Sequence, residues 1–372
     1  MSAPARTVPV EDRAAAAERP RSSAAAALAR YRTRARRRTL IIVGLWALAA
    51  VAFVVSLQVG PMGLTASEVI RAYVDADAPE RLRTIVLHLR TPPALLALLV
   101  GAALALAGAQ MQTILDNPLA EPFTLGVSAA AACGAAFAIL SGVTLPVLPS
   151  ATLPVAAAAL AHAASGVIAL AARSSRAGGR ETMVLLGIAM VFGFQALLAF
   201  LQYRASTESL QQIVFWSLGS LTRARWETVL AMAIVLAVIA PLFWMSGWKL
   251  TALRLGEARA AAMGIDVPRL RVRALIGVSI LAAVAVSSVG VIGFIGLVGP
   301  HVARILVGED QRFLLPASTA VGAALLCGAH AVSQVIIPGV VMPVGILTSL
   351  VGVPVFVMIV LSRGRLRAGA GR

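Results

Sequence analysis

Long runs of apolar residues that contain no charge constrain the fold of this chain more than any other feature. A transmembrane helix needs about 20 apolar residues, since the hydrocarbon core of a bilayer is about 30 Å thick. A charged side chain at the bilayer centre is costly. With Asp, Glu, Lys and Arg taken as breaks, seven runs reach that length: 39–67, 91–115, 122–172, 182–203, 228–248, 274–303 and 313–362. The sequence therefore predicts an all-α polytopic membrane protein.

The number of spans follows from the length and punctuation of these runs. Runs 122–172 and 313–362 are long enough for two spans each, and glycines and prolines interrupt both. Two spans in each of them bring the total to nine. At the end of run 274–303, closely spaced glycines from Gly290 onward precede Pro300, which favours a break followed by a short helix. We expect ten transmembrane helices.

Arginine indicates on which side of the membrane each loop lies. The segments 30–38 and 362–372, at the two ends of the chain, are strongly basic, and the loops 173–181, 249–273 and 304–312 together carry a net excess of Arg and Lys. Cytoplasmic loops carry an excess of Lys and Arg. Both termini are therefore expected in the cytoplasm, which requires an even number of spans. The chain is predicted to be a multi-pass protein of the plasma or inner membrane.

The chain divides into a short tail and one membrane domain. Residues 1–38 are rich in Ala, Arg and Pro without apolar periodicity, which predicts a disordered basic cytoplasmic tail. Residues 39–365 form the transmembrane domain. The run 40–57 lacks a clear small-residue cleavage site and many spans follow it, so we interpret it as the first span rather than a signal peptide.

Composition and motif searches argue against several other functions. The net charge is +16, but aromatic residues make up only 5% of the chain and arginine carries nearly all of the positive charge, so nucleic acid is not an expected partner. The sequence lacks a G-x-x-x-x-G-K-[ST] motif, so it does not bind ATP by that route. Cys133 and Cys327 lie in apolar runs, and the four histidines lack metal-ligand spacing. No metal, cofactor or catalytic residue is predicted for this chain.

The acidic residues bear on the energy source. All sixteen lie outside the apolar cores, whereas an ion-coupled secondary transporter usually carries an ionisable side chain at membrane depth. His162 and His330 are the only titratable candidates within spans, and each is more simply explained as a packing residue. A membrane-embedded enzyme would need converging Asp, Glu, His or Cys side chains. We favour an energy source in another subunit and keep an ion-coupled transporter as the alternative.

Three sequence blocks carry a family resemblance. The first is RTPPALLALLVGAALALAGAQMQTILDNPLAEPFTLGVS (90–128), and the third is MPVGILTSLVGVPVF (342–356). The second, VGVIGFIGLVGPHVARILVGEDQRFLLP (289–316), includes Gly296, Pro300, His301 and Arg304. In this order the blocks resemble the FecCD-type permease family of ABC importers for iron–siderophore complexes, haem and cobalamin. The resemblance extends over about 40–365.

One motif of the first block has a physical interpretation of its own. Its prolines end one span and begin the next, and an asparagine side chain can cap the backbone of such a turn. The sequence therefore predicts a tight cytoplasmic loop that contains Asn117, Pro118, Leu119, Ala120 and Pro122.

The resemblance implies the architecture of a type II ABC importer permease, which passes substrate from a binding protein to the cytoplasm by alternating access. Two permease subunits, identical or related, would form the pathway. Two separate ATPase subunits would bind Mg-ATP and hydrolyse it, and an extracytoplasmic substrate-binding protein would dock on the outer face. Ferric siderophore is the favoured cargo, with haem and cobalamin as alternatives.

Within the basic region 249–273, the segment LGEARAAAMGI (255–265) is short, helix-prone and bounded by glycines. By the resemblance it is the coupling helix pair that contacts the ATPase, and a plain connecting helix is the alternative. The predicted coupling residues are Leu255, Gly256, Glu257, Ala258, Arg259, Ala260, Met263 and Gly264.

The resemblance also implies that the fifth span, 183–202, lines the pathway. This span carries Gln195 and Gln202 together with Met183 and Met190. Such a lining suits a bulky amphipathic cargo, although core packing explains the methionines equally well. The cytoplasmic gate is predicted at Arg180, Glu181 and Thr182.

The outer face departs from the family pattern. Arg90 matches the first arginine of R-x-P-R, but Pro93 occupies the position of the second. His330 and Gln334 stand where D-x-x-x-R is usual. We expect the binding protein to dock through Arg90, Arg81 and Arg83, with Arg223 and Arg225 on the same side.

Overall fold

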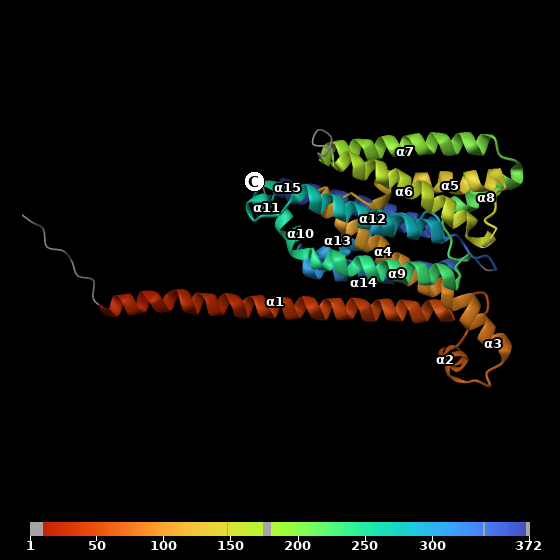
Figure 1. Cartoon of the computed structure of the whole chain (residues 1–372). Coiled ribbons are helices and arrows are strands. Elements are labelled where there is room, and N and C mark those ends of the chain that lie inside the picture. Colours follow the sequence, from red (N-terminus) through yellow and green to blue (C-terminus); the bar gives the residue numbers. More distant parts are fainter. Residues whose placement is uncertain (1–9, 147, 174–179, 338, 370–372) are drawn as a thin grey trace, which may run out of the picture.

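The apolar runs of the sequence are helices in the computed structural model, which describes residues 10–146, 148–173, 180–337 and 339–369 (Figure 1). The elements in chain order are α1 (Val10–Gln58), α2 (Ala66–Val74), α3 (Glu80–Thr84), the π-helical η1 (Ile85–Arg90), α4 (Thr91–Ile114), the 3-10 helix η2 (Pro122–Leu125), α5 (Val127–Ser141), the 3-10 helix η3 (Pro149–Ala151), α6 (Thr152–Arg173), α7 (Arg180–Tyr203), α8 (Thr207–Ser217), α9 (Trp226–Met245), α10 (Gly247–Leu253), α11 (Glu257–Ala262), α12 (Val267–Val289), α13 (Ile295–Val307), α14 (Gln311–Ser333) and α15 (Val344–Gly369).

The predicted number of membrane helices is confirmed. Among the described residues, seven helices are long and apolar enough to cross a membrane, and three shorter apolar helices accompany them, which makes ten. The shorter ones are α5, α13 and the Val344–Met358 part of α15. The predicted break in run 274–303 is also present, since α12 ends at Val289 and Gly290 follows with a φ of +78°. Glycine adopts this left-handed conformation without steric cost.

The first helix corrects one expectation. The sequence predicted a disordered tail over residues 1–38, but α1 begins at Val10, so residues 10–38 are helical and continue directly into the first span. This part of α1 extends well beyond the rest of the bundle (Figure 1). Alanine and arginine are among the strongest helix formers. The prediction considered only how little apolar surface this segment can bury and neglected its helix propensity.

Helix α4 is the centre of the bundle, where it packs against α14, α13, α12 and α9. Glycine contacts bring these helices close together. A Cβ atom on Gly108 would lie 1.8 Å from the carbonyl oxygen of Gly296 in α13, and one on Gly101 would lie 2.3 Å from that of Gly322 in α14. Membrane helices associate through such close backbone approach, because burial in lipid supplies little hydrophobic driving force between helices.

Helix α7 is the least buried of the long apolar helices that the structure describes. It runs along one edge of the bundle, where it packs mainly against α5, α6 and η2 (Figure 1). Only 6% of its most apolar segment is buried, compared with 83% for the segment that contains α4. One long apolar face of α7 is therefore uncovered in the single chain.

The two ends of the bundle differ in composition. Helices α10 and α11 lie at the same end as the end of α15, whereas α2, α3 and α8 lie at the other end (Figure 1). The first end carries the basic segments, and the positive-inside rule assigns it to the cytoplasm.

Candidate functional site

The predicted coupling segment is a short helix that protrudes from the cytoplasmic end. Gly256 and Gly264 flank α11 with φ values of +107° and +79°, which favour glycine. The large apolar side chains of Leu255 and Met263 are 52% and 55% exposed, whereas Ala260 is buried against the bundle. The other predicted coupling residues are exposed as well: Gly256, Glu257, Ala258, Arg259 and Gly264. The arrangement is a small, partly apolar surface on a short helix between two glycines.

An ion pair connects this surface to the spans. The carboxylate of Glu257, at the start of α11, accepts a hydrogen bond from the guanidinium of Arg271 at 2.8 Å. The Arg271 side chain is only 6% exposed and belongs to α12. The ion pair therefore joins α11 to α12 by a charge-assisted contact in addition to the chain connection.

Arg254, in the turn between α10 and α11, is the centre of a second ion-pair network. Its guanidinium contacts the carboxylate of Asp116, just after α4, and that of Glu309, in the loop between α13 and α14, each at 3.2 Å. The guanidinium of Arg304 in α13 contacts Glu309 at 3.0 Å. The network joins the ends of α4, α13 and α10. We did not predict it, because its members are far apart in the sequence and no motif connects them.

The Asn117 loop contains the predicted cap. The side-chain oxygen of Asn117 accepts a hydrogen bond from the Leu119 N–H at 3.0 Å, and its carbonyl accepts one from Ala120 at 3.1 Å. Pro118 is half-buried, while Ala120 and Pro122 are buried. The loop is more than a surface hairpin, since it continues through η2 into the interior and reaches the middle of α7. There a Cβ on Gly126 would lie 2.8 Å from Cβ of Met190.

The same loop contacts the start of α13. A Cβ on Gly296 would lie 3.0 Å from Cδ of Pro122 and 3.6 Å from Cβ of Glu121, and Phe294 before it has a φ of +69°, which is unusual for a bulky residue. The next turn of α13 contains Gly296, which packs on α4, and the interior proline Pro300. His301, after Pro300, is half-buried. The family block around Gly296 is thus the place where α4, α13 and the Asn117 loop converge.

The predicted pathway residues of α7 lie on its surface, with one exception. Gln195 is exposed and Gln202 is half-buried, and their spacing of seven residues places them on one helix face. Met183 is fully buried, so it packs in the core and does not line a pathway in this conformation. Thr182, at the predicted gate, is exposed. Arg180 and Glu181 begin α7, but their side chains lie outside the described residues.

Arg90 has a structural role at the outer end that differs from the predicted one. Its guanidinium donates hydrogen bonds to the carbonyls of Leu57 at 2.9 Å, Gln58 at 2.7 Å and Met62. Arg90 is only 8% exposed. It therefore satisfies carbonyls at the C-terminal end of α1. This placement does not fit the docking role predicted for Arg90, because its donors face inward.

The other predicted docking residues are exposed. Arg81 and Arg83 lie on α3, and Arg223 and Arg225 lie in the loop before α9, all with accessible side chains. At the altered family positions, Gln334 directly after α14 contacts α1, and His330 of α14 lies beside it. Nε2 of Gln334 lies 3.4 Å from both the Ser56 carbonyl and Nε2 of His330.

Known proteins resemble this chain over most of its length. Residues 48–362 match the model of the FecCD transport family. The hemin transport system permease protein HmuU of Yersinia pestis is 34% identical over 283 residues, which cover 76% of this chain and 85% of the relative. The vitamin B12 import system permease protein BtuC of Vibrio vulnificus is 32% identical over 277 residues, with 73% and 81% covered.

A solved structure shares the fold. It is an inward-facing ABC transporter assigned to the metal-chelate type, with a TM-score of 0.77 and 30% sequence identity. The match covers 87% of this chain and 99% of that one. The helical bundle and its protruding cytoplasmic helix are therefore those of an ABC transporter permease, a translocation subunit that is not itself an ATPase.

The chain belongs to the FecCD transport family. It is the multi-pass permease subunit of an ABC importer of the iron-chelate, haem and vitamin B12 type, a class that implies ATPase and binding-protein partners. Permeases of this family usually bind no cofactor. The resemblance predicted from the three sequence blocks is confirmed.

Proposed function

We propose that this permease imports ferric siderophore complexes, with haem and cobalamin as the alternative cargoes. The observation that carries the proposal is the uncovered face of α7, where Gln195 and Gln202 are the polar groups on an otherwise apolar surface. A cargo that presents both amide-like oxygens and apolar surface suits such a lining. The metal-chelate assignment of the solved structural relative supports the same choice.

We further propose that two copies of the permease, identical or related, enclose the pathway between their α7 helices. An apolar face this extensive is covered either by lipid or by a partner, and the exposed Gln195 with the half-buried Gln202 on it favours a partner. Thr182 and the neighbouring Arg180 and Glu181 would form the gate at the cytoplasmic end of this pathway.

Coupling to ATP hydrolysis would run through α11. Two ATPase subunits, one for each permease copy, would contact Leu255, Met263 and the exposed residues between them. Movement of α11 would reach α12 through Glu257 and Arg271, and α4 and α13 through Arg254. These contacts support a route by which movement of α11 reaches the centre of the bundle during alternating access.

Transport by the complete complex tests the cargo. Proteoliposomes that contain the permease, its ATPase and its binding protein would be supplied with ferric siderophore, haem or cobalamin. We expect ATP-dependent uptake of ferric siderophore that persists when an uncoupler collapses the proton gradient. Preferential uptake of haem or cobalamin would show that ferric siderophore is not the main cargo. Uptake that needs no ATP and stops when the uncoupler is added would favour the ion-coupled alternative.

The docking residues call for a separate test. Arg81 and Arg83 are exposed on α3, where carboxylates of a binding protein can reach them. Charge reversal of both, Arg81→Glu with Arg83→Glu, should weaken binding-protein docking by about tenfold and reduce uptake. The control reverses Arg269, which is exposed at the cytoplasmic end and should leave docking unchanged. If docking and uptake equal those of the unmodified protein, Arg81 and Arg83 do not form the docking surface for the binding protein.

A further inference from the structure

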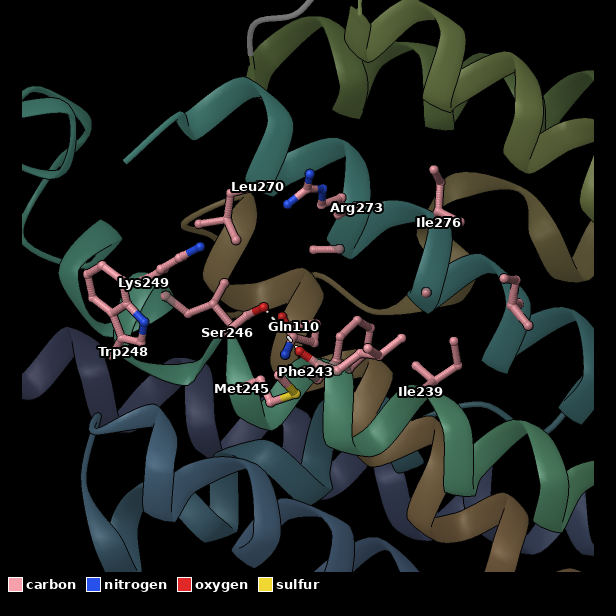
Figure 2. A pocket seen from close by; sticks show the side chains of 15 residues that line it. Gln110, Ile239, Phe243, Met245, Ser246, Trp248, Lys249, Leu270, Arg273 and Ile276 are labelled. Carbon is pink, nitrogen blue, oxygen red and sulfur yellow. Dashed lines mark hydrogen bonds between the residues drawn. The ribbon is translucent and has the colours of Figure 1, made fainter. Parts of the chain in front are cut away.

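A cavity of about 620 Å³ lies between α4, α9, α10 and α12 (Figure 2). Its walls are mostly apolar and include Ile239 and Phe243 of α9 and Ile280 of α12. The volume is in the range of about 300–1,000 Å³ typical of ligand sites. The cavity is remote from the exposed face of α7, whose neighbours are α5, α6 and η2. It is therefore a different site from the proposed pathway.

Two basic side chains border the cavity at its cytoplasmic end. Lys249 enters from α10 and Arg273 from α12 (Figure 2). Neither forms an ion pair with any part of the chain that the structure describes. The Lys249 ammonium lies 5.6 Å from the centre of the Trp248 ring, which is compatible with a cation–π contact. Two unneutralised cations beside an apolar cavity favour a ligand that has an anionic group and an apolar portion.

A buried amide group in the cavity wall adds a third property that a ligand should have. Gln110, on α4, lines the cavity and is fully buried, and neither its side-chain oxygen nor its nitrogen has a hydrogen-bond partner. Buried polar groups are nearly always paired, because leaving one unpaired costs free energy. A ligand group with a carbonyl or hydroxyl at this depth would satisfy the Gln110 amide.

The surroundings indicate where such a ligand comes from. Leu242 and Met245 of α9 and Ile276 of α12 also line the cavity, and they are 53%, 75% and 40% exposed. These apolar side chains face outward at the membrane level, close to the cytoplasmic end of α9. Trp248 beside them is 53% exposed, and tryptophan is enriched at the membrane–water interface. The cavity is thus accessible from the inner leaflet.

We propose that this cavity binds one anionic phospholipid of the inner leaflet. Its phosphate pairs with Lys249 and Arg273, its glycerol ester region accepts a hydrogen bond from Gln110, and one acyl chain lies along Ile239, Phe243 and Ile280. The lipid fills the space between α9 and α12 next to the coupling segment. Its position stabilises the packing of α9, α10 and α12 against α4.

Native mass spectrometry of the complete transporter tests this assignment. Complexes would be released from nanodiscs of equal phosphatidylglycerol and phosphatidylcholine. We expect one retained phosphatidylglycerol per permease in preference to phosphatidylcholine. Replacing both cations, Lys249→Gln with Arg273→Gln, should lower that retention by about tenfold, because each basic side chain contributes to binding of an anionic lipid. The matched control, Arg32→Gln with Arg36→Gln, removes two exposed charges from α1 and should retain the lipid.

A photoactivatable phosphatidylglycerol gives a second measurement on the unmodified protein. Crosslinked peptides should map to 239–250 and 270–280. Equal retention of the two lipids, unchanged retention in the Lys249 and Arg273 variant, or crosslinks confined to other helices would each overturn the proposal. The readout is lipid retention, so the result does not depend on which cargo the transporter carries.

Discussion

Helices α4 and α7 are both long and apolar, but they occupy opposite environments. In α4, small residues allow neighbouring backbones to approach, and its most apolar segment is 83% buried. In α7, large side chains such as Leu185, Phe192 and Phe200 point outward, and only 6% of its most apolar segment is buried. Apolarity alone therefore identifies a membrane helix without showing whether it faces protein. The pattern of small residues distinguishes α4, which packs against other helices, from α7, which has an uncovered face.

The largest expected effect comes from a substitution that fills a close helix contact. Gly108→Ala places a methyl group 1.8 Å from the Gly296 carbonyl, so α4 and α13 must separate. We expect a loss of about 3 kcal/mol or more, by analogy with overpacked cores. Size-exclusion chromatography and thermal unfolding in detergent would measure it.

The matched control for that prediction lies in α7. A Cβ added to Gly193 would have no atom within 4 Å apart from its own helix turn, so Gly193→Ala should not weaken the folded state. Equal destabilisation of the two variants would contradict the assignment of α4 as the packed helix and α7 as the open one.

The next effect concerns communication between the coupling helix and α4. Arg254→Ala removes the contacts to Asp116 and Glu309, so movement of α11 should no longer reach α4 and α13. We expect ATP hydrolysis to continue while uptake falls by about tenfold, equivalent to ~1.4 kcal/mol. ATPase activity and uptake would be measured in the same proteoliposomes. The control is Arg269→Ala, whose 79% exposed side chain pairs only locally with Asp266. Parallel loss of both activities would indicate misfolding instead of uncoupling.

A smaller effect is expected from substitutions in α7, the exposed helix of the two. Gln195→Leu with Gln202→Leu keeps α7 helical and removes its polar groups, so the apparent KM for cargo should rise several-fold with little change in thermal stability. Gln212→Leu, on the exposed surface of α8, is the control. Unchanged KM in the double variant would remove these glutamines from the proposed pathway.

The smallest effect is a pH dependence at the N-terminus of α14, the main packing partner of α4. Hydrogen bonds from Arg312 hold the pKa of Asp310 below its ordinary value of 3.8. A lowered pKa means that the ionised form stabilises the folded state, so this contribution is complete above the unfolded pKa and is lost as pH falls through the folded value. Thermal unfolding between pH 6 and pH 3 should show this loss.

Asp310→Asn should remove that part of the pH dependence. Asp266→Asn, at the equivalent cap of α12, serves as the comparison. An Asp310→Asn protein whose stability changes with pH as much as that of the unmodified protein would contradict the role of the Asp310 carboxylate.

Much of the fold was predictable because membrane burial imposes a simple rule on charge. The ten helices and the break before Ile295 followed from charge-free lengths and glycine spacing. The helical start of α1 did not, because helix propensity was neglected there. The inner ion-pair network depends on long-range proximity of Asp116, Arg254 and Glu309, which no local pattern encodes.

The outer face shows a second limit of sequence reasoning. Arg90 matched a family arginine, but its position in a motif did not reveal whether the guanidinium faces outward. In the structure it closes the end of α1. The sequence also did not predict a site at Gln110, because only the structure shows that its buried amide lacks a hydrogen-bond partner.

The brevity of α13 has a consequence for the permeability barrier. Its 13 residues span about 20 Å, less than the ~30 Å of hydrocarbon, so irregular backbone at 290–294 must complete the crossing. Such backbone persists at membrane depth only where protein shields it. The seal against ion leakage here therefore depends on neighbouring side chains rather than on helix length.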